Sequence, residues 1–130
     1  QEYIVPIRDT SENVAKVFDK SVQFILVDGA HEYNFVKLDY ELWFPKLVNG
    51  GLIAFHDCWQ TFGVHFFTSI MLLTSTKIRD PKLIDTLTIV EKVEHNNVLD
   101  RISNIIFVFY RLLVGWMGVI RIDKTGTLLK

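Results

Sequence analysis

The sequence contains a single cysteine, Cys58, and so has neither an internal disulfide nor a cysteine-rich zinc site. Its 14 basic and 15 acidic residues give a net charge of −1, without a basic stripe or a long run of one sign. This balance excludes a nucleic-acid-binding surface and a charged disordered tail as organising features. One cysteine also fits a reducing compartment, and we expect a cytoplasmic protein.

Long apolar segments and nucleotide-binding loops are also missing. The most hydrophobic segment, residues 105–120, has 16 residues and includes Arg111. A membrane-spanning helix needs about 20 apolar residues, so we expect a buried helix and no membrane span. The chain has neither a G-x-G-x-x-G motif nor a P-loop. It opens without Met and without the basic start of a signal peptide, so we expect a processed or truncated N-terminus.

The apolar residues that are present, 49% of the chain, fall into short runs of strand length and longer runs of helical spacing. The 130 residues suffice for one domain, residues 1–130, with one modest core. Alternating strands and helices predict an α/β fold whose central strands are parallel. Strands are predicted over residues 3–7, 23–28, 52–56, 83–93 and 118–123, and helices over 10–18, 34–44, 64–75 and 99–113.

Two of these strands end on acidic residues. The apolar run 23–28 ends at Asp28, and the run 52–56 ends at His56 and is followed by Asp57. Both runs are continuous, which is typical of strands covered on both faces, and the helix between them is expected to stop at Gly50-Gly51. Parallel strands joined by a helix share one carboxyl edge, where α/β proteins bind ligands.

Asp28, His56 and Asp57 could therefore hold a divalent cation together, since carboxylates and imidazole suit Mg²⁺, Mn²⁺ or Fe²⁺. The alternative is that the strand-end acids cap the following turns through bonds to backbone N–H groups. His31, three residues after Asp28, could act as a general base, as a metal ligand or as a solvated loop residue. Cys58 has no neighbouring base and is expected to pack in the interior.

The segment FILVDGAHEYNFVKLDYELWFPKLVNGGLIAFHDCW, residues 24–59, resembles the second half of class I S-adenosylmethionine-dependent methyltransferases. It is most similar to the small-molecule and sugar O-methyltransferases related to macrocin O-methyltransferase and to cephalosporin hydroxylase-like proteins. The pattern is a strand ending in D-G-x-H-x-Y, a helix with an internal Asp, Gly-Gly and a strand ending in H-D. Here it comprises Asp28, Gly29, His31, Tyr33, Asp39, Trp43, Gly50, Gly51, His56 and Asp57.

This resemblance implies a Rossmann-like, mostly parallel sheet with flanking helices. It also implies S-adenosylmethionine as cofactor of the full-length protein and a divalent cation, Mg²⁺ first, for methyl transfer to a small-molecule or sugar hydroxyl. Metal-assisted members often place an acid where this chain has Ala30, which moves the expected catalytic base to His31 or leaves the site inactive. The implied metal ligands are Asp28, His56 and Asp57, and the implied cofactor contacts are Asp9, Thr10, Ser11, Asp28 and Gly29.

The chain differs from the family in what is absent. The family's glycine-rich cofactor loop, its first strand and its acidic ribose-binding residue would precede the matched segment. We therefore expect the C-terminal portion of a methyltransferase domain that lacks the first strands, with an exposed sheet edge available for homo-oligomers. Two alternatives remain: an iron-dependent oxygenase using His31, His56 and either Asp28 or Asp57, and a non-catalytic interaction domain.

Overall fold

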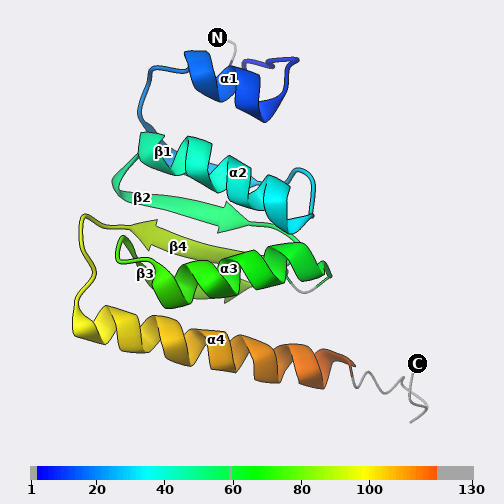
Figure 1. The fold of residues 1–130 in the computed structure, drawn as a ribbon, viewed down its shortest axis with the longest axis vertical. Coiled ribbons are helices and arrows are strands. Elements are labelled where there is room, and N and C mark those ends of the chain that lie inside the picture. Colours follow the sequence, from blue (N-terminus) through cyan, green and yellow to red (C-terminus); the bar gives the residue numbers. More distant parts are fainter. Residues whose placement is uncertain (1–2, 59, 120–130) are drawn as a thin grey trace.

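The fold is seen in a computed structural model that describes the backbone of residues 3–58 and 60–119, with side chains to residue 114. Strands and helices alternate along the chain, as the apolar runs predict (Figure 1). The elements are α1 (Ser11–Val17), β1 (Val22–Val27), α2 (Tyr33–Trp43), the 3₁₀ turn η1 (Phe44–Lys46), β2 (Leu47–Phe55), α3 (Phe62–Thr74), β3 (Ile78–Ile84), β4 (Leu87–Lys92) and α4 (Val98–Val119).

The described strands form one sheet in the order β1-β2-β4-β3. β1 and β2 are parallel neighbours, with Ile25 opposite Ile53 and Val27 opposite Phe55, so the predicted α/β fold and its parallel pair are confirmed. The sheet also has an antiparallel member, because β4 pairs antiparallel with both β2 and β3. β3 and β4 are joined by a tight turn, which forces them antiparallel, so three strands run one way and β4 runs against them.

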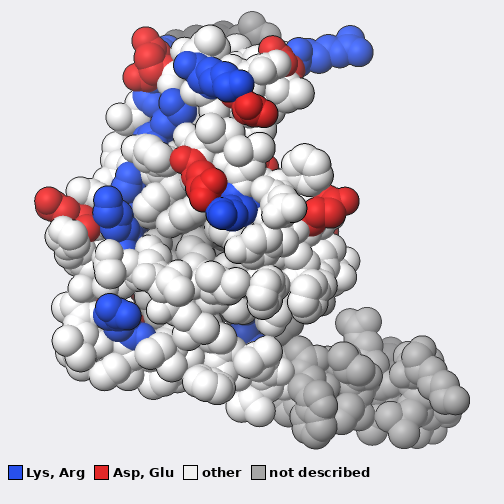
Figure 2. Space-filling model, in the orientation of Figure 1, with Lys and Arg blue, Asp and Glu red and all other residues white. Residues whose placement is uncertain are grey.

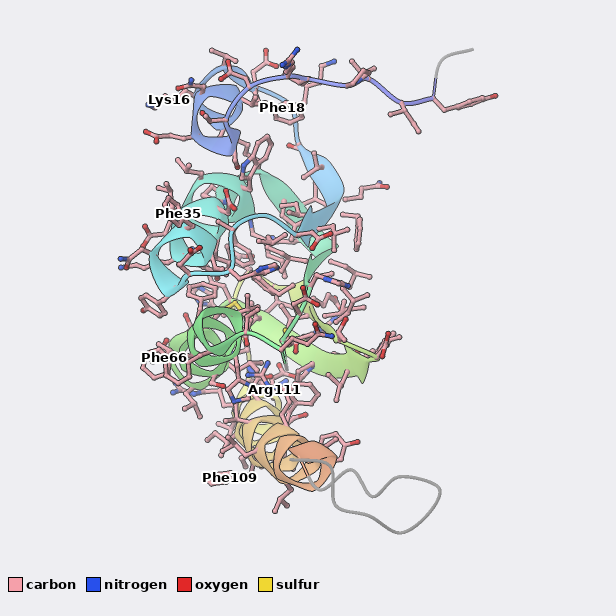
Figure 3. All side chains as sticks on the ribbon, turned by 90° about the vertical axis from the view of Figure 1, so that its right-hand side faces the viewer. Lys16, Phe18, Phe35, Phe66, Phe109 and Arg111 are labelled. Atoms are coloured by element: carbon pink, nitrogen blue, oxygen red, sulfur yellow. The ribbon has the colours of Figure 1, made fainter. Side chains whose placement is uncertain are left out.

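One face of the sheet carries the core. Figure 3 shows α2 and α3 on the same side of the strands, and the side chains packed between the layers are buried. The opposite face of β1 is open: Phe24 is 56% exposed and Leu26 50% exposed. The expectation that strand 23–28 is covered on both faces was therefore wrong, because alternate residues point to opposite faces and only one face has helices over it. The core includes Val27, Val36, Ile53, Phe55, Phe67, Leu72, Ile78 and Val90.

Several predicted boundaries differ from the structure. Residues 3–7 form an exposed segment without strand pairing, and the run 83–93 spans the end of β3, a turn and β4. The turn contains Asp85 at a φ of 53°, a left-handed conformation that Asp adopts more readily than most residues. The predicted strand 118–123 lies outside the described residues, except for its first two residues, which belong to α4.

The glycine pair after α2 has a different role from the one expected. Gly50 and Gly51 lie within β2 and do not cap α2, which ends at Trp43 before the turn η1. Gly50 has a φ of 82°, at the irregularity that shifts the β1–β2 register between Val22 and Phe24. Glycine is favoured at such a position because it has no Cβ to clash in the left-handed region.

A buried arginine connects α4 to the rest of the core. Arg111 is fully buried, and its guanidinium makes four hydrogen bonds to α3 and β4. Burial lowers the pKa of Arg111, and no described carboxylate forms an ion pair with it. The four acceptors are Oγ1 of Thr68, Oγ1 of Thr88, the carbonyl oxygen of His65 and Oγ of Ser69.

No described helix is long and apolar enough to cross a bilayer.

Replacing Arg111 by lysine should destabilise the fold, because an ammonium group keeps the charge but cannot reach four acceptors from one planar fork. We expect the free energy of unfolding to fall by at least about 2 kcal/mol, from lost charge-assisted hydrogen bonds. Chemical denaturation measures this, with the exposed Arg101→Lys on the same helix as the matched control. Equal stabilities for the two variants would contradict the structural role of Arg111.

Candidate functional site

The carboxyl ends of β1 and β2 bring the predicted acidic residues together. Asp28 follows β1 directly, and His56 and Asp57 follow β2. The N–H of His56 donates to the carbonyl of Val27 at 3.0 Å, so the parallel ladder continues to the point where the polar residues begin. These side chains therefore occupy the same rim because of strand pairing and not because of any loop.

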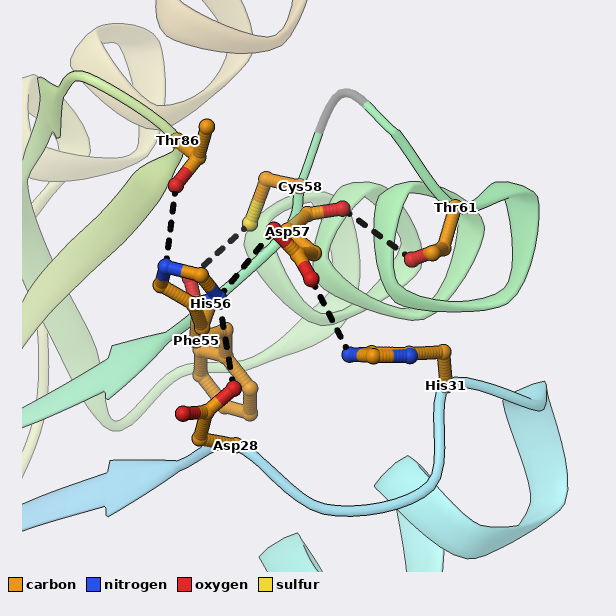
Figure 4. Close-up of polar contacts among 8 residues, drawn as sticks. All are labelled: Asp28, His31, Phe55, His56, Asp57, Cys58, Thr61 and Thr86. Carbon is orange, nitrogen blue, oxygen red and sulfur yellow. Dashed lines mark hydrogen bonds and ion pairs between the residues drawn. The ribbon is translucent and has the colours of Figure 1, made fainter.

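Asp57 lies in a strained turn that fixes its direction. Its φ is 55°, in the left-handed region. Its carbonyl oxygen accepts hydrogen bonds from the N–H groups of Gln60 and Thr61, both at 3.2 Å, and from Oγ1 of Thr61 at 3.0 Å. Non-glycine residues in this conformation cost energy and persist where the surroundings hold them, often at functional sites. The turn points the Asp57 carboxylate toward the loop after β1 (Figure 4).

Two imidazole rings face the two carboxylates (Figure 4). Nε2 of His31 lies 3.3 Å from Oδ2 of Asp57. Nδ1 of His56 lies 3.2 Å from Oδ1 of Asp28 and 3.1 Å from Oδ1 of Asp57. Asp57 is the more enclosed acid, with 18% of its side chain exposed against 52% for Asp28. The predicted residues thus lie in one cluster, with Asp57 at its centre.

Both of these ring nitrogens are buried without a hydrogen bond of good geometry. Buried polar atoms normally have a partner, and an unsatisfied one costs about 1–3 kcal/mol. A cation between nitrogen and carboxylate oxygens would satisfy them. Ligand atoms of Asp28, His31 and Asp57 all lie within 4.8 Å of one another, which fits a divalent cation. His56, expected as a ligand, is not in this set, and His31, expected as a base, is.

The ring of His56 is held from its other side by a residue that the sequence did not reveal. Oγ1 of Thr86 lies 3.2 Å from Nε2 of His56, and the carbonyl of Thr86 accepts the N–H of Cys58 at 3.0 Å. A partner on the second ring nitrogen fixes which nitrogen faces the carboxylates. Thr86 lies in the β3–β4 turn, 30 residues from His56. No local pattern connects the two, so only the sheet order reveals this contact.

The expected cofactor contacts divide between two grooves. Thr10 caps α1 by accepting the N–H of Asn13, and Oδ1 of Asp9 accepts from the N–H of Thr10 and the side-chain amide of Asn13, which lowers the pKa of Asp9. Oγ of Ser11 accepts the indole N–H of Trp43 at 2.8 Å.

Ser11, Asp28 and Gly29 line one groove of about 450 Å³ along β1. Asp9 instead lines a neighbouring groove formed by residues from 5 to 20. The first groove is continued by Asp39 of α2, whose Oδ2 would lie 3.6 Å from a Cβ placed at Gly29. The structure therefore brings three of the five expected cofactor contacts to one surface.

Cys58 and His65 lie next to the cluster and contact each other. Cys58 is fully buried, which confirms the expectation of packing, and burial raises the pKa of its thiol. Nδ1 of His65 lies 3.1 Å from the carbonyl oxygen of Cys58. Burial, and secondarily the charge of Arg111, lower the pKa of His65. A raised pKa disfavours the thiolate, so Cys58 lacks the environment of a nucleophile.

The loop that carries His31 rests on the start of α3. A Cβ at Gly63 would overlap the carbonyl oxygen of His31 and come within 2.6 Å of the backbone nitrogen of Tyr33. Glycine at this position therefore allows the two backbones to touch. Gly63 is a positioning residue for His31 that the sequence analysis did not single out.

Comparison with known proteins finds a family match for the first part of this chain. Residues 1–58 match the family model described as a methyltransferase domain. A segment of 47 residues is 43% identical to the uncharacterised protein y4gI of Sinorhizobium fredii, covering 36% of this chain and 5% of that protein.

A search of solved structures finds the MycE methyltransferase from the mycinamycin biosynthetic pathway, in complexes with Mg and SAH, with and without mycinamycin VI. Each match has 17% identity and a TM-score of 0.49, and covers 64% of this chain and 28% of the MycE chain. This chain thus spans only a small part of each of these proteins.

The fold and the site together define a class of protein. It has an α/β sheet that gathers carboxylates and imidazoles at the carboxyl ends of its strands. The family comparison then adds that residues 1–58 match the model of a methyltransferase domain. The predicted resemblance to class I methyltransferases is confirmed over that segment, which includes Asp28, His31, His56 and Asp57.

Substituting Gly63 by alanine should disturb the His31 loop, because backbone atoms cannot yield as a flexible side chain can. We expect a loss of about 1–3 kcal/mol in unfolding free energy, the range for overpacking. Thermal unfolding measures this, with Gly29→Ala as control because a Cβ there meets only an ordinary contact. Unchanged stability in Gly63→Ala, or an equal loss in Gly29→Ala, would contradict the close backbone contact.

Proposed function

We propose that this chain forms part of an S-adenosylmethionine-dependent O-methyltransferase that acts on a small-molecule or sugar hydroxyl with the help of a divalent cation. The observation that carries the proposal is the cluster of two carboxylates and two unsatisfied ring nitrogens at the β1–β2 rim. The methyltransferase-domain match over residues 1–58 supports methyl transfer as the reaction.

Asp28 and Asp57 are proposed as the anionic ligands, with an imidazole as the third donor. Bound there, a cation would orient the substrate hydroxyl and lower its pKa. The MycE complexes contain Mg, so Mg²⁺ is the first candidate. Mn²⁺ and Fe²⁺ also suit a site that mixes carboxylate oxygens with imidazole nitrogen.

The two histidines are candidates for the nitrogen ligand of the cation and for the general base. The sequence analysis proposed His56 as the ligand and His31 as the base. The set of possible ligand atoms that all lie within 4.8 Å of one another includes His31 and not His56, which supports the reverse. We propose that His31 supplies the nitrogen ligand and that His56, held through Nε2 by Thr86, takes the hydroxyl proton on Nδ1. S-adenosylmethionine, when bound, would supply the methyl group, and its sulfonium sulfur would leave as the deprotonated hydroxyl oxygen takes that group.

Iron-dependent oxygenation is the second candidate. Two imidazoles beside carboxylates are the donor types of the two-histidine, one-carboxylate iron face, and His31 and His56 lie beside the same acid, Asp57. Iron in the purified protein would favour this reading, and retained S-adenosylhomocysteine would favour methyl transfer. The open edge of β1 remains a candidate surface for homo-oligomers, as the sequence predicts.

Metal binding should depend on Asp57. We expect Asp57→Asn to weaken Mg²⁺ or Mn²⁺ binding at least about tenfold, since removing even a supporting contact of a metal site costs that much. Calorimetric titration measures it. Asp80→Asn is the matched control, because Asp80 is an exposed acid that also has a positive φ, 51°, which asparagine tolerates. Equal affinities in the two variants would remove Asp57 from the ligand set.

The two histidines are separable by the same titration. His31→Ala should weaken metal binding, because it removes a ligand, whereas His56→Ala should leave the metal affinity within about threefold and abolish proton transfer. The opposite pattern would restore the assignment made from the sequence. Loss of metal affinity in both would show that both rings are ligands.

These 130 residues alone should bind S-adenosylmethionine weakly. Among the described residues, the groove along β1 gathers three of the expected cofactor contacts, Ser11, Asp28 and Gly29. The glycine-rich loop and the ribose-binding acid of the family have no counterpart in this sequence. Each missing hydrogen bond to a charged or buried group costs about 1.5–3 kcal/mol. Two such losses weaken binding by roughly a hundredfold or more. Isothermal titration tests this, and a micromolar dissociation constant would contradict it.

A further inference from the structure

The helix α4 buries two polar residues and exposes a continuous apolar side. Asn104 and Arg111 are fully buried, with Phe107 and Val108 beside them. Figure 3 shows Arg111 pointing toward α3 and the sheet, and Phe109 pointing away from them. The outward side, here called the α4 stripe, consists of Val98, Leu99, Ile102, Ile105, Ile106, Phe109, Leu112 and Leu113.

The α4 stripe is too large to be an ordinary surface feature. Its eight side chains are each between 40% and 75% exposed. Together they present on the order of 900 Å² of apolar surface, against about 300–600 Å² for the largest patch on a typical monomer. A standard protein interface buries about 800 Å² on each partner, so this single helix face has the area that a stable dimer needs.

The positions of the stripe repeat every seven residues, the spacing of helices that pack side by side. Ile102 and Phe109 form its middle row. Val98, Ile105 and Leu112 form one flanking row, and Leu99, Ile106 and Leu113 form the other. The spacing is the same when read from either end.

We propose that the α4 stripe is a homodimer interface, in which a second copy of this chain packs its own α4 antiparallel about a two-fold axis near Ile105 and Ile106. Such an axis places each flanking row against its own copy in reverse. Ile106 then faces the partner's Ile106, and Ile102 faces the partner's Phe109. A two-fold interface needs a self-complementary surface, and this row pattern provides one.

Charge favours a second copy over a membrane surface as the occupant. Helices that lie on membranes are rich in Lys and Arg on their polar side. Between residues 98 and 114, Arg101 is exposed and Arg111 is buried, and the stripe itself contains no charge. Over α4 the surface in Figure 2 is largely uncharged. An uncharged stripe on a chain of net charge −1 lacks attraction to anionic lipid but suits an identical surface.

Sedimentation equilibrium of the whole chain, over about 1–100 μM, tests the interface. Wild type should be a dimer, and Ile106→Glu should weaken dimerisation at least about a hundredfold, because the axis brings two unpaired carboxylates together. Ser103→Glu, at an exposed position of α4 outside the stripe, is the matched control and should remain dimeric. Circular dichroism confirms that the variants stay folded, since both sites are on the surface.

Two variants of opposite charge distinguish a two-fold interface from nonspecific hydrophobic association. Ile106→Glu and Ile106→Lys should each be monomeric alone and should form a one-to-one heterodimer when mixed. A monomeric wild type at 100 μM would overturn the proposal, as would mixed variants that stay apart. Dissociation by Leu26→Glu on the open face of β1, with Ile106→Glu still dimeric, would assign self-association to the sheet instead. Binding to anionic vesicles that Ile106→Glu abolishes, without any dimer, would assign the stripe to a membrane.

Discussion

The parallel pairing of β1 with β2 is the constraint on which the candidate site depends. Its register places Val27 beside Phe55, and one further hydrogen bond from His56 carries the ladder to the ends of both strands. Asp28 and Asp57 therefore emerge on the same rim before any loop geometry is considered. The helix between the strands closes this unit, and the turn at Asp57 aims the second carboxylate across the rim toward His31. The positions of these side chains therefore follow from the pairing of the two strand backbones.

The sequence predicted what local pattern determines. The strand runs ending at Asp28 and His56, and the helices between and after them, were found because apolar spacing records which face is buried. The β3–β4 hairpin was read as one strand, because its turn lacks the usual glycine and depends on Asp85 in a left-handed conformation. The open face of β1 was also missed, since Phe24 and Leu26 look like core residues whether or not anything covers them.

The candidate site was predictable to the same extent. Its four titratable residues follow from strand ends and one adjacent loop, and the structure gathers all four. The roles that we propose for the two histidines did not follow from the sequence, because a ligand and a base differ by the direction in which a ring nitrogen points. That direction is set by Thr86 and Gly63, which reach the cluster from β3–β4 and α3 through contacts distant in sequence. Neither contact leaves a periodic trace that a single sequence could reveal.

Arg111 explains why the apolar side of α4 faces outward. A guanidinium with four hydrogen bonds to α3 and β4 fixes the rotation of the helix. Asn104, about two turns earlier, shares the same inward side through its bond to the carbonyl of Ile78. With these hydrogen bonds made on the inward side of α4, the apolar rows face outward. Rotating the helix to bury them would break every one of those bonds and leave the buried acceptors on α3 and β4 without that partner. The same polar anchors that hold α4 to the domain thus determine the surface that it offers to a partner.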